Sequence, residues 1–255
     1  MIPKVIHYCW FGRGPKSELS ERCIASWKKQ FPEYEIKEWN EDNFDVNIIP
    51  YTAEAYRNKK YAFVSDYARF WILYKYGGIY FDTDVEVIKD MSPILTRGPY
   101  LGCELTYKDG NYIPHVATGL GMAAVAGMEF YKKILDIYQK KYYISPKGYI
   151  TGTVVQIITR LIKNEAPELN LNDICGFRGI TIYPAEYFCP KNYNTGELTI
   201  TDNTYTIHHY IASWADDKNG KKKVSARKKQ LKNMFNHYCF LVSYFFTGKC
   251  KKSKK

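Results

Sequence analysis

A predicted helix, a double glycine and a short apolar strand ending in two aspartates follow one another over residues 62–84. In residues 62–76, apolar and aromatic side chains recur every three or four positions, as in a helix with one buried face. Gly77 and Gly78 can end this helix and reverse the chain. Residues 79–81 then read as a buried strand, with Asp82 and Asp84 just past its carboxyl end. This succession favours an α/β fold, in which ligands bind beyond the carboxyl ends of strands.

The two aspartates predict a metal site. Two carboxylates one residue apart repel each other, and a divalent cation turns that repulsion into binding. Mg²⁺ and Mn²⁺ prefer oxygen ligands, often one or two carboxylates together with substrate phosphates. An isolated Asp-x-Asp also occurs as a solvated turn after a strand. The buried strand before Asp82 favours a seat for a metal that carries a diphosphate.

Asp66 and Arg69 lie three residues apart on the predicted helix and are therefore neighbours on its surface. As a plain surface ion pair they would contribute roughly 0–1 kcal/mol. A carboxylate also accepts hydrogen bonds from sugar hydroxyls, and a guanidinium donates to hydroxyls or phosphate. Because their helix leads straight into the aspartate strand, we favour a contact with a donor sugar.

Two other segments offer candidate ligand-binding residues. Trp10 ends the first predicted strand and is either a core aromatic residue or a flat surface on which a nucleotide base stacks. In the second case, Gly12 would let the backbone approach the ligand closely. His208 and His209 end a late strand, where a structural role is the alternative to metal binding. Adjacent strand residues point to opposite faces, so at most one of them is expected to be a ligand.

The rest of the chain predicts one large α/β domain. The chain has 255 residues, of which 45% are hydrophobic and 25% charged, as in ordinary globular proteins. Further helices are expected over residues 17–31, 52–58, 129–142 and 154–163, and further strands over 5–11, 34–39, 100–105, 180–184 and 205–209. Residues 115–126 are small and glycine-rich, with Thr118-Gly119 near a possible substrate. We place the domain at residues 1–215 and a basic, partly helical tail at 216–255.

The positive charge is concentrated in this tail. The net charge is +11, and residues 218–255 contain 13 Lys or Arg and no Asp or Glu, so the remainder is close to neutral. A basic tail seeks anionic surfaces, either lipid head groups or nucleic acid. Residues 239–246 are aromatic and too short to span a bilayer. They are either a last core helix or an interfacial anchor, and we favour the anchor.

The cysteines and the amino terminus bear on location. Seven cysteines without a Cys-x-x-Cys indicate reduced thiols rather than a zinc site or a redox pair. The first residues enter a predicted strand at once and lack the layout of a signal peptide. We therefore expect a cytoplasmic protein at the inner face of the membrane.

Four segments together resemble the family 32 glycosyltransferases, the sugar-binding Asp-x-Asp group. This family includes the fungal outer-chain mannosyltransferase and many bacterial capsule and surface-polysaccharide enzymes, and it is distantly similar to the glucosyltransferase domains of large clostridial toxins. The matching segments are residues 2–12, 65–69, 76–84 and 208–214. One departure concerns the acceptor side: many relatives have proline where this chain has Thr153.

The resemblance implies a GT-A fold, a Rossmann-like mixed sheet flanked by helices, with a nucleotide-sugar donor, Mn²⁺ or Mg²⁺, and retention of anomeric configuration. Asp84 would ligate the metal directly, and His208 or His209 would add a late ligand. Asp82 would contact ribose and sugar, partly through the metal. The residues implied in catalysis are Asp82, Asp84 and Arg69. Those implied in donor binding are Trp10, Gly12, Ser65, Asp66, Arg69, Gly78, Asp82, Ser213 and Trp214.

The sequence thus predicts transfer of a hexose, most readily from a UDP-sugar, to a glycan or lipid-linked oligosaccharide. UDP-galactose, UDP-glucose, their N-acetyl forms and GDP-mannose all remain open as donors. Two alternatives come from other classes. A phosphohydrolase using the same aspartates would need further metal ligands or a nucleophilic aspartate. A nucleic-acid-binding module would rely on the basic tail, which has no base-reading motif.

Overall fold

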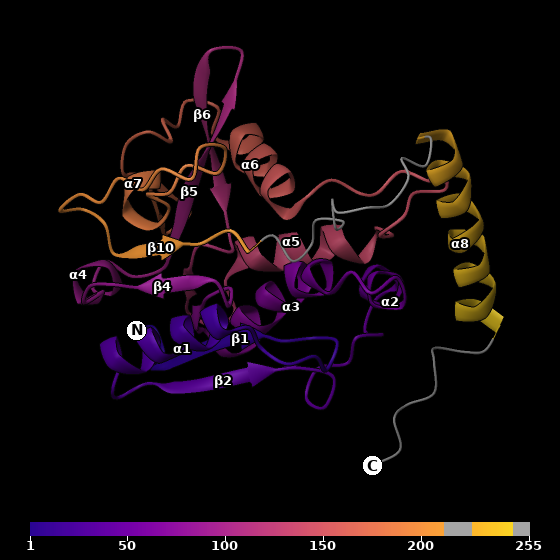
Figure 1. Ribbon diagram of the computed structural model, residues 1–255, viewed down its shortest axis with the longest axis horizontal. Coiled ribbons are helices and arrows are strands. Elements are labelled where there is room, and N and C mark those ends of the chain that lie inside the picture. Colours follow the sequence, from indigo (N-terminus) through magenta and orange to yellow (C-terminus); the bar gives the residue numbers. More distant parts are fainter. Residues whose placement is uncertain (212–225, 247–255) are drawn as a thin grey trace.

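The structure is a computed structural model and describes residues 1–211 and 226–246 (Figure 1). The helices are α1 (Glu18–Gln30), α2 (Pro50–Arg57), α3 (Tyr61–Tyr76), α4 (Ser92–Leu95), α5 (Glu129–Gln139), α6 (Val154–Glu165), α7 (Ala185–Phe188) and α8 (Ala226–Phe246). The strands are β1 (Val5–Cys9), β2 (Glu35–Trp39), β3 (Gly78–Tyr80), β4 (Val85–Val87), β5 (Tyr100–Lys108), β6 (Asn111–Ala117), β7 (Met122–Ala124), β8 (Cys175–Phe177), β9 (Ile180–Tyr183) and β10 (Thr206–His208).

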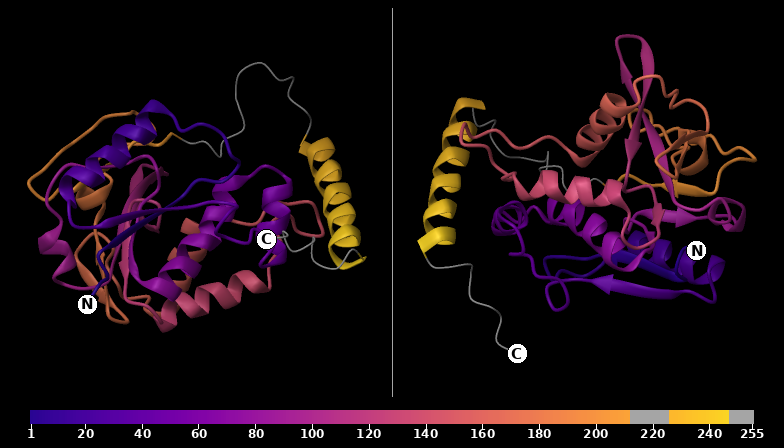
Figure 2. Two further views of the ribbon diagram at one scale, coloured as in Figure 1. Left: turned by 90° about the horizontal axis from the view of Figure 1, so that it is seen from below. Right: turned by 180° about the vertical axis from the view of Figure 1, so that it is seen from behind.

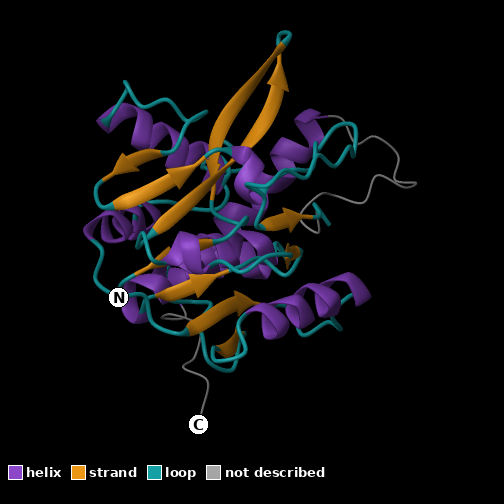
Figure 3. Cartoon of the chain, turned by 90° about the vertical axis from the view of Figure 1, so that its left-hand side faces the viewer, coloured by secondary structure: helices purple, strands orange, loops and turns teal. Residues whose placement is uncertain are grey.

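A mixed sheet with strand order β2-β1-β3-β7-β5-β9-β8 forms the centre of the molecule. β1 pairs in parallel with β2 and β3, whereas β7 runs antiparallel to β3 and β5. β6 pairs with β5, and this hairpin projects beyond the rest of the molecule (Figure 3). β4 and β10 form a small second sheet. The predicted α/β class, with a mixed sheet flanked by helices, is confirmed.

The sheet separates two hydrophobic cores because successive strand residues face opposite sides. Ile79 belongs to one core and its neighbour Tyr80 to the other. Helices α3, α5 and α6 contribute to the core that contains Tyr80, and α1 and α7 to the core that contains Ile79. Both faces of the central strands are therefore buried, and only their ends can meet a ligand.

The local sequence explains where the helices begin and end. Ser17 caps α1, since its hydroxyl accepts a hydrogen bond from the Ser20 backbone N–H at 3.1 Å. Thr153 and Gln156 form a capping box at the start of α6. Gly77 ends α3 with a positive φ of 66°, a conformation that suits glycine.

Helix α8 packs against α2 at one end of the molecule (Figures 1 and 2). His237 of α8 and Glu54 of α2 are both fully buried, with His237 Nδ1 2.8 Å from Glu54 Oε1. Glu54 Oε2 also accepts a hydrogen bond from the Ile144 backbone N–H at 3.0 Å. Arg57 adds a hydrogen bond from Nη1 to Ser243 Oγ at 2.7 Å. A polar network thus attaches this part of the tail to the body.

Most predicted elements are present within a few residues of their expected bounds. The expectation of a small, glycine-rich stretch at residues 115–126 misses the end of β6 and all of β7. The hydrophobic pattern does not predict these strands, because β7 is only three residues long and the first part of β6 is exposed. Among the helices that the structure describes, none has the length and apolar character required to cross a membrane.

Candidate active site

The candidate site lies where β1, β2 and β3 end together. These strands run in parallel, with His7 of β1 level with Tyr80 of β3. Trp10 and Asp82 follow these residues by three and two positions, so both lie at the carboxyl edge of the sheet. This edge is where open α/β sheets bind ligands, and the sequence-predicted aspartates are therefore at the expected place.

Arg69 connects the predicted sugar-binding helix to the aspartate motif. It is only 3% exposed, and its Nη2 lies 3.2 Å from Asp66 Oδ1 and 3.2 Å from Asp82 Oδ1. Its Nη1 donates to Thr118 Oγ1 at 3.0 Å, and its Nε donates to the Ser65 carbonyl at 3.1 Å. Asp66 and Arg69 are therefore not a solvated surface pair. The guanidinium fixes the positions of two carboxylates in the buried wall of the site.

Gly119 leaves the space that Asp82 occupies. A Cβ at this position would lie 2.2 Å from Asp82 Oδ2 and 3.5 Å from Arg69 Nη1. Tyr80 also positions the carboxylate, because its hydroxyl donates to Asp82 Oδ1 at 2.9 Å. The predicted proximity of Thr118-Gly119 to the site therefore has a structural basis: one residue binds Arg69 and the other makes room for Asp82.

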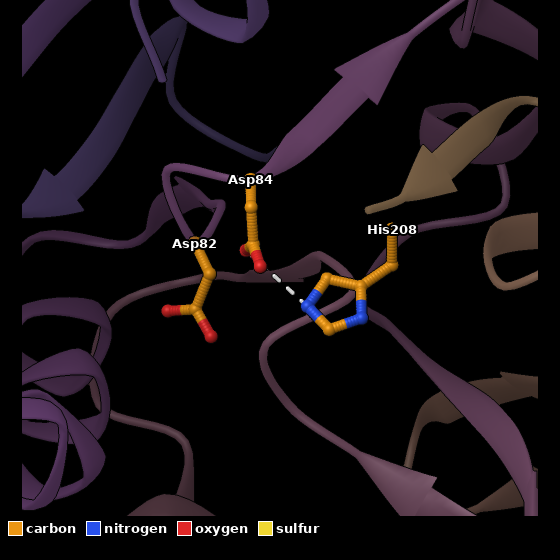
Figure 4. Close-up of side chains that lie close together, drawn as sticks. All are labelled: Asp82, Asp84 and His208. Carbon is orange, nitrogen blue, oxygen red and sulfur yellow. Dashed lines mark ion pairs between the residues drawn. The ribbon is translucent and has the colours of Figure 1, made fainter. Parts of the chain in front are cut away.

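Asp82, Asp84 and His208 converge on one point (Figure 4). A ligand atom from each lies within 4.8 Å of the others. The small second sheet brings His208 here, since β10 pairs antiparallel with β4 and places His208 level with Val85. His208 Nε2 is 3.2 Å from Asp84 Oδ1. Two carboxylates and one imidazole form a set that can hold a divalent cation.

His209 lies outside this cluster. Its Nε2 is 2.7 Å from Glu86 Oε2, and its backbone N–H donates to the Asp84 carbonyl at 2.9 Å. The expectation that only one of the two adjacent histidines faces the aspartates agrees with this geometry, and that residue is His208. The assignment of His209 as an alternative ligand is thereby corrected.

The two aspartates of the cluster differ in the direction of their pKa shifts. Burial raises the pKa of Asp82, and this effect outweighs the opposing charge of Arg69. Burial also tends to raise the pKa of Asp84, but the adjacent His208 lowers it below its usual value. For His208, burial lowers the pKa, yet the Asp84 charge and hydrogen bond raise it to about 10. In the absence of a metal, a proton on His208 thus balances the Asp84 carboxylate.

A cation suits this donor set for a further reason. His208 Nδ1 is buried and has no hydrogen-bond partner in the described part of the chain. Nε2 is the ring nitrogen that faces the aspartates, and the imidazole also packs against the Tyr210 ring. Metal binding requires Nε2 to lose its proton, and a divalent charge would replace the proton that balances Asp84.

Trp10 lines a pocket of about 270 Å³ beside the ends of β1 and β2. The pocket is surrounded by Trp10, Arg13, Gly14, Lys16, Glu38, Asn40 and Glu41. The indole is partly exposed, and its Nε1 donates to the Gly14 carbonyl at 2.7 Å. Gly12 has a φ of 96° and donates its backbone N–H to Glu41 Oε1 at 2.6 Å. Trp10 therefore packs against one hydrophobic core and also forms a wall of a polar pocket.

The other predicted donor residues are placed differently. Ser65 lies beside Arg69, to which it offers its backbone carbonyl. Gly78 begins β3, at the opposite end of the strand from Asp82, and packs against Val5 and His7. Its assignment to donor binding is therefore corrected: close strand packing, rather than a ligand, requires this glycine.

Ser213 and Trp214 fall outside the described residues. The chain leading to them does reach the site, because the Ile211 backbone N–H donates to Asp84 Oδ2 at 2.9 Å. Tyr210 has a φ of 56°, and its ring lies 4.3 Å from that of His208 between centroids. Sequence reasoning missed these contacts because they depend on the chain turning at Tyr210, for which the sequence has no glycine signal.

Residues 17–100 match the family model described as a glycosyltransferase sugar-binding region containing a DXD motif. Inositol phosphoceramide mannosyltransferase 3 of Schizosaccharomyces pombe is 33% identical over 101 residues, 37% of this chain and 27% of that protein. Lactosylceramide 4-alpha-galactosyltransferase of Mus musculus is 28% identical over 188 residues, 69% of this chain and 47% of that protein. The chain thus spans between a quarter and half of these two relatives.

A third relative matches over most of both lengths. An uncharacterized glycosyltransferase of Acanthamoeba polyphaga mimivirus is 26% identical over 227 residues, which cover 84% of each chain. The stretch matched by the family model contains Asp66, Arg69, Asp82 and Asp84. The family model thus covers the two aspartates and the Asp66–Arg69 pair, whereas Trp10 and His208 lie outside its match.

Proposed function

We propose that the chain is a glycosyltransferase of the class that carries a DXD sugar-binding region, and that it transfers a hexose from a nucleotide sugar, with UDP-hexoses favoured, to a glycan or lipid-linked acceptor in surface-polysaccharide synthesis. The observation that carries this proposal is the convergence of Asp82, Asp84 and His208 beside the buried Arg69. We further propose that the anomeric configuration is retained.

Each group at the site has a role in this proposal. Asp82, Asp84 and His208 would hold a divalent cation, which when bound offsets the negative charge that grows on the departing diphosphate. Arg69 keeps Asp82 in place and supplies a positive charge behind it. Asp66, held by the same guanidinium, accepts hydrogen bonds from the donor sugar hydroxyls. Trp10 forms one wall of the pocket for the base.

The same geometry weighs against a phosphohydrolase. That alternative requires further metal ligands or a nucleophilic aspartate. Among the residues described, the cluster of Asp82, Asp84 and His208 is the only group of three or more potential metal ligands. Asp82 is tied to Arg69 and Tyr80, so it is poorly placed to attack a phosphate.

Thermal shift tests the donor and metal roles together, because a ligand that binds only the native state raises its stability. The ligands are UDP-galactose, UDP-glucose, their N-acetyl forms and GDP-mannose, each with and without Mn²⁺. We expect one nucleotide sugar to stabilise the wild type in the presence of Mn²⁺ and to have no effect on Asp84→Ala. Asp202→Ala, which removes an exposed aspartate, is the matched control and should behave as the wild type. No shift with any nucleotide sugar in a folded wild type would contradict the proposal.

We also propose that α8 holds the enzyme on an anionic membrane at the cytoplasmic face. Five large apolar side chains recur along α8 at steps of three and four residues and are 52–70% exposed: Leu231, Phe235, Tyr238, Val242 and Phe245. The spacing places them on one helix face, whereas His237 and Phe240 are buried. The 13 basic residues of 218–255 complement anionic lipid and disfavour a second copy of the same chain.

A further inference from the structure

Glu104 lies at the same edge of the sheet as the aspartate motif. β5 and β3 are both antiparallel to β7 and therefore run in the same direction. Ala123 of β7 is level with both Ile79 and Tyr100. Asp82 comes three residues after Ile79, and Glu104 four residues after Tyr100. With one strand between them, β3 and β5 are about 10 Å apart, close to the space that one sugar ring and its contacts require.

The direction of the Glu104 side chain follows from strand alternation. Glu104 shares a face of β5 with Gly102, two residues earlier. Gly102 packs against Phe188, since a Cβ there would lie 2.6 Å from the Phe188 ring. The next residue, Cys189, has its Sγ 2.8 Å from the hydroxyl of Tyr210. Glu104 therefore faces the segment that positions His208, on the metal side of the sheet.

The electrostatics of the site agree with this placement. Burial raises the pKa of Glu104, and the charge of His208 acts in the opposite direction. The charge of Glu104 also contributes to the raised pKa of Tyr210, after burial and Cys189. Glu104 is thus within electrostatic reach of His208, the last residue of β10, and of Tyr210, two residues later.

Glu104 has unused hydrogen-bonding capacity. Its carboxylate has no hydrogen bond or ion pair within the described ranges, although the residue is only partly exposed. His115 lies directly across from it on β6, but the His115 imidazole Nε2 is engaged with Thr106 Oγ1 at 2.8 Å. The Glu104 oxygens are open to water and can accept a hydrogen bond from a donor that arrives with the substrate.

We propose that the Glu104 carboxylate accepts a hydrogen bond from the attacking hydroxyl group, which belongs to the acceptor sugar in transfer and to water in hydrolysis of the donor. This inference rests on the proposed glycosyltransferase function. A bond forms between the hydroxyl oxygen and the anomeric carbon while the bond from that carbon to the phosphate oxygen breaks. Glu104 orients the hydroxyl group through this hydrogen bond as it approaches. As the carbon–phosphate oxygen bond breaks, the hydroxyl proton leaves Glu104 for the departing phosphate oxygen, and Glu104 ends the reaction unchanged.

The test compares nucleotide binding with turnover in Glu104→Gln, which keeps the size of the side chain and removes its charge. Binding of UDP with Mn²⁺ is measured by calorimetry. Turnover is measured as hydrolysis of the nucleotide sugar that stabilises the wild type, so no acceptor needs to be known. Glu168→Gln, at an exposed glutamate after α6, is the matched control. Glu104→Asp tests whether a carboxylate restores activity.

We expect Glu104→Gln to bind UDP as tightly as the wild type. It should hydrolyse the donor about 10- to 100-fold more slowly, because one charge-assisted hydrogen bond is lost in the transition state. Glu104→Asp should recover part of the rate, and Glu168→Gln should match the wild type. Unchanged hydrolysis in Glu104→Gln, loss of its UDP binding, or a covalent glycosyl adduct on Glu104 would each overturn this inference alone. Failure of the wild type to bind either UDP or GDP in the presence of Mn²⁺ would instead contradict the proposed function.

Discussion

At the scale of single residues, the site depends on one guanidinium that serves two carboxylates. Arg69 is buried and lies 3.2 Å from both Asp66 and Asp82. Burial raises the pKa of Asp66 to about 7, and the neighbouring Asp82 charge adds to this effect, although Arg69 opposes it. Keeping Asp66 ionised therefore costs stability, which is typical of a residue retained for binding.

Replacing Asp66 by Asn should stabilise the protein, and more at high pH than at low pH. Because the folded-state pKa lies above the usual 3.8, the stability contributed by Asp66 falls as pH rises from about 4 to about 7. At about pH 8 we expect Asp66→Asn to raise the free energy of unfolding by more than about 1 kcal/mol, with a corresponding rise in Tm. At about pH 5 the increase should be smaller. Calorimetric melts at both values measure this difference.

The exposed Asp202→Asn is the control and should leave Tm unchanged at both pH values. An equal effect of Asp66→Asn at both pH values would show that the Asp66 carboxyl titrates normally. The same variant should lose most of the stabilisation by the nucleotide sugar, because its amide is uncharged and has one accepting oxygen where the carboxylate has two.

At the scale of elements, the turn from α3 into β3 sets the position of the aspartates. Gly77 and Gly78 both have a positive φ, of 66° and 96°. At Gly78 a Cβ would lie 2.7 Å from the Val5 carbonyl oxygen, on the neighbouring strand. The chain can therefore leave the helix and enter the sheet within two residues only if both are glycine.

Gly78→Ala should cost more stability than the same change at Gly98. Gly98 has nearly the same φ, 95°, but a Cβ there would meet nothing within 4 Å. We expect a loss of about 1 kcal/mol for Gly98→Ala from backbone strain alone and of about 3 kcal/mol or more for Gly78→Ala, where the clash with backbone adds to it. Urea unfolding measures both. Equal losses would show that strand packing around Gly78 is loose.

At the scale of the whole molecule, α8 has one face attached to the body and another exposed. The buried pair of His237 and Glu54 holds the inner face, while an apolar stripe faces solvent. Deleting the tail would therefore expose the Glu54 surface as well as remove the proposed anchor. Substitutions on the outer face separate membrane binding from folding, since these side chains do not pack on the domain.

Replacing Leu231, Phe235 and Val242 together by Ser should abolish membrane binding without affecting donor binding. In flotation assays we expect the wild type to bind vesicles containing phosphatidylglycerol, to release them at high salt and to bind pure phosphatidylcholine weakly. The triple variant should remain unbound and keep its thermal shift with the nucleotide sugar. If the triple variant binds these vesicles as well as the wild type does, the proposal is contradicted. If the wild type is a dimer in solution and the triple variant is not, a second copy of the chain is the partner of α8.

The sequence by itself determined the elements and the chemistry of the aspartate motif, because these follow from patterns within short windows. The periodicity of residues 62–76, the double glycine and the apolar strand predict α3, β3 and the location of Asp82 and Asp84. Most other helices and strands are recovered in the same way. Six elements are missed: β4, β6, β7, β8, α4 and α7. All but β6 have only three or four residues, which carry little periodic signal.

Only the tertiary structure decided which distant residues meet. It selects His208 over His209, because the register of β10 with β4 sets which imidazole faces Asp84. It places Glu104 at the sheet edge through the shared partner β7 and buries His237 against Glu54. Glu54 and His237, for example, lie 183 positions apart in the sequence. The physical cause of such contacts is the pairing and packing of whole elements, which leaves no mark in the local order of the amino acids.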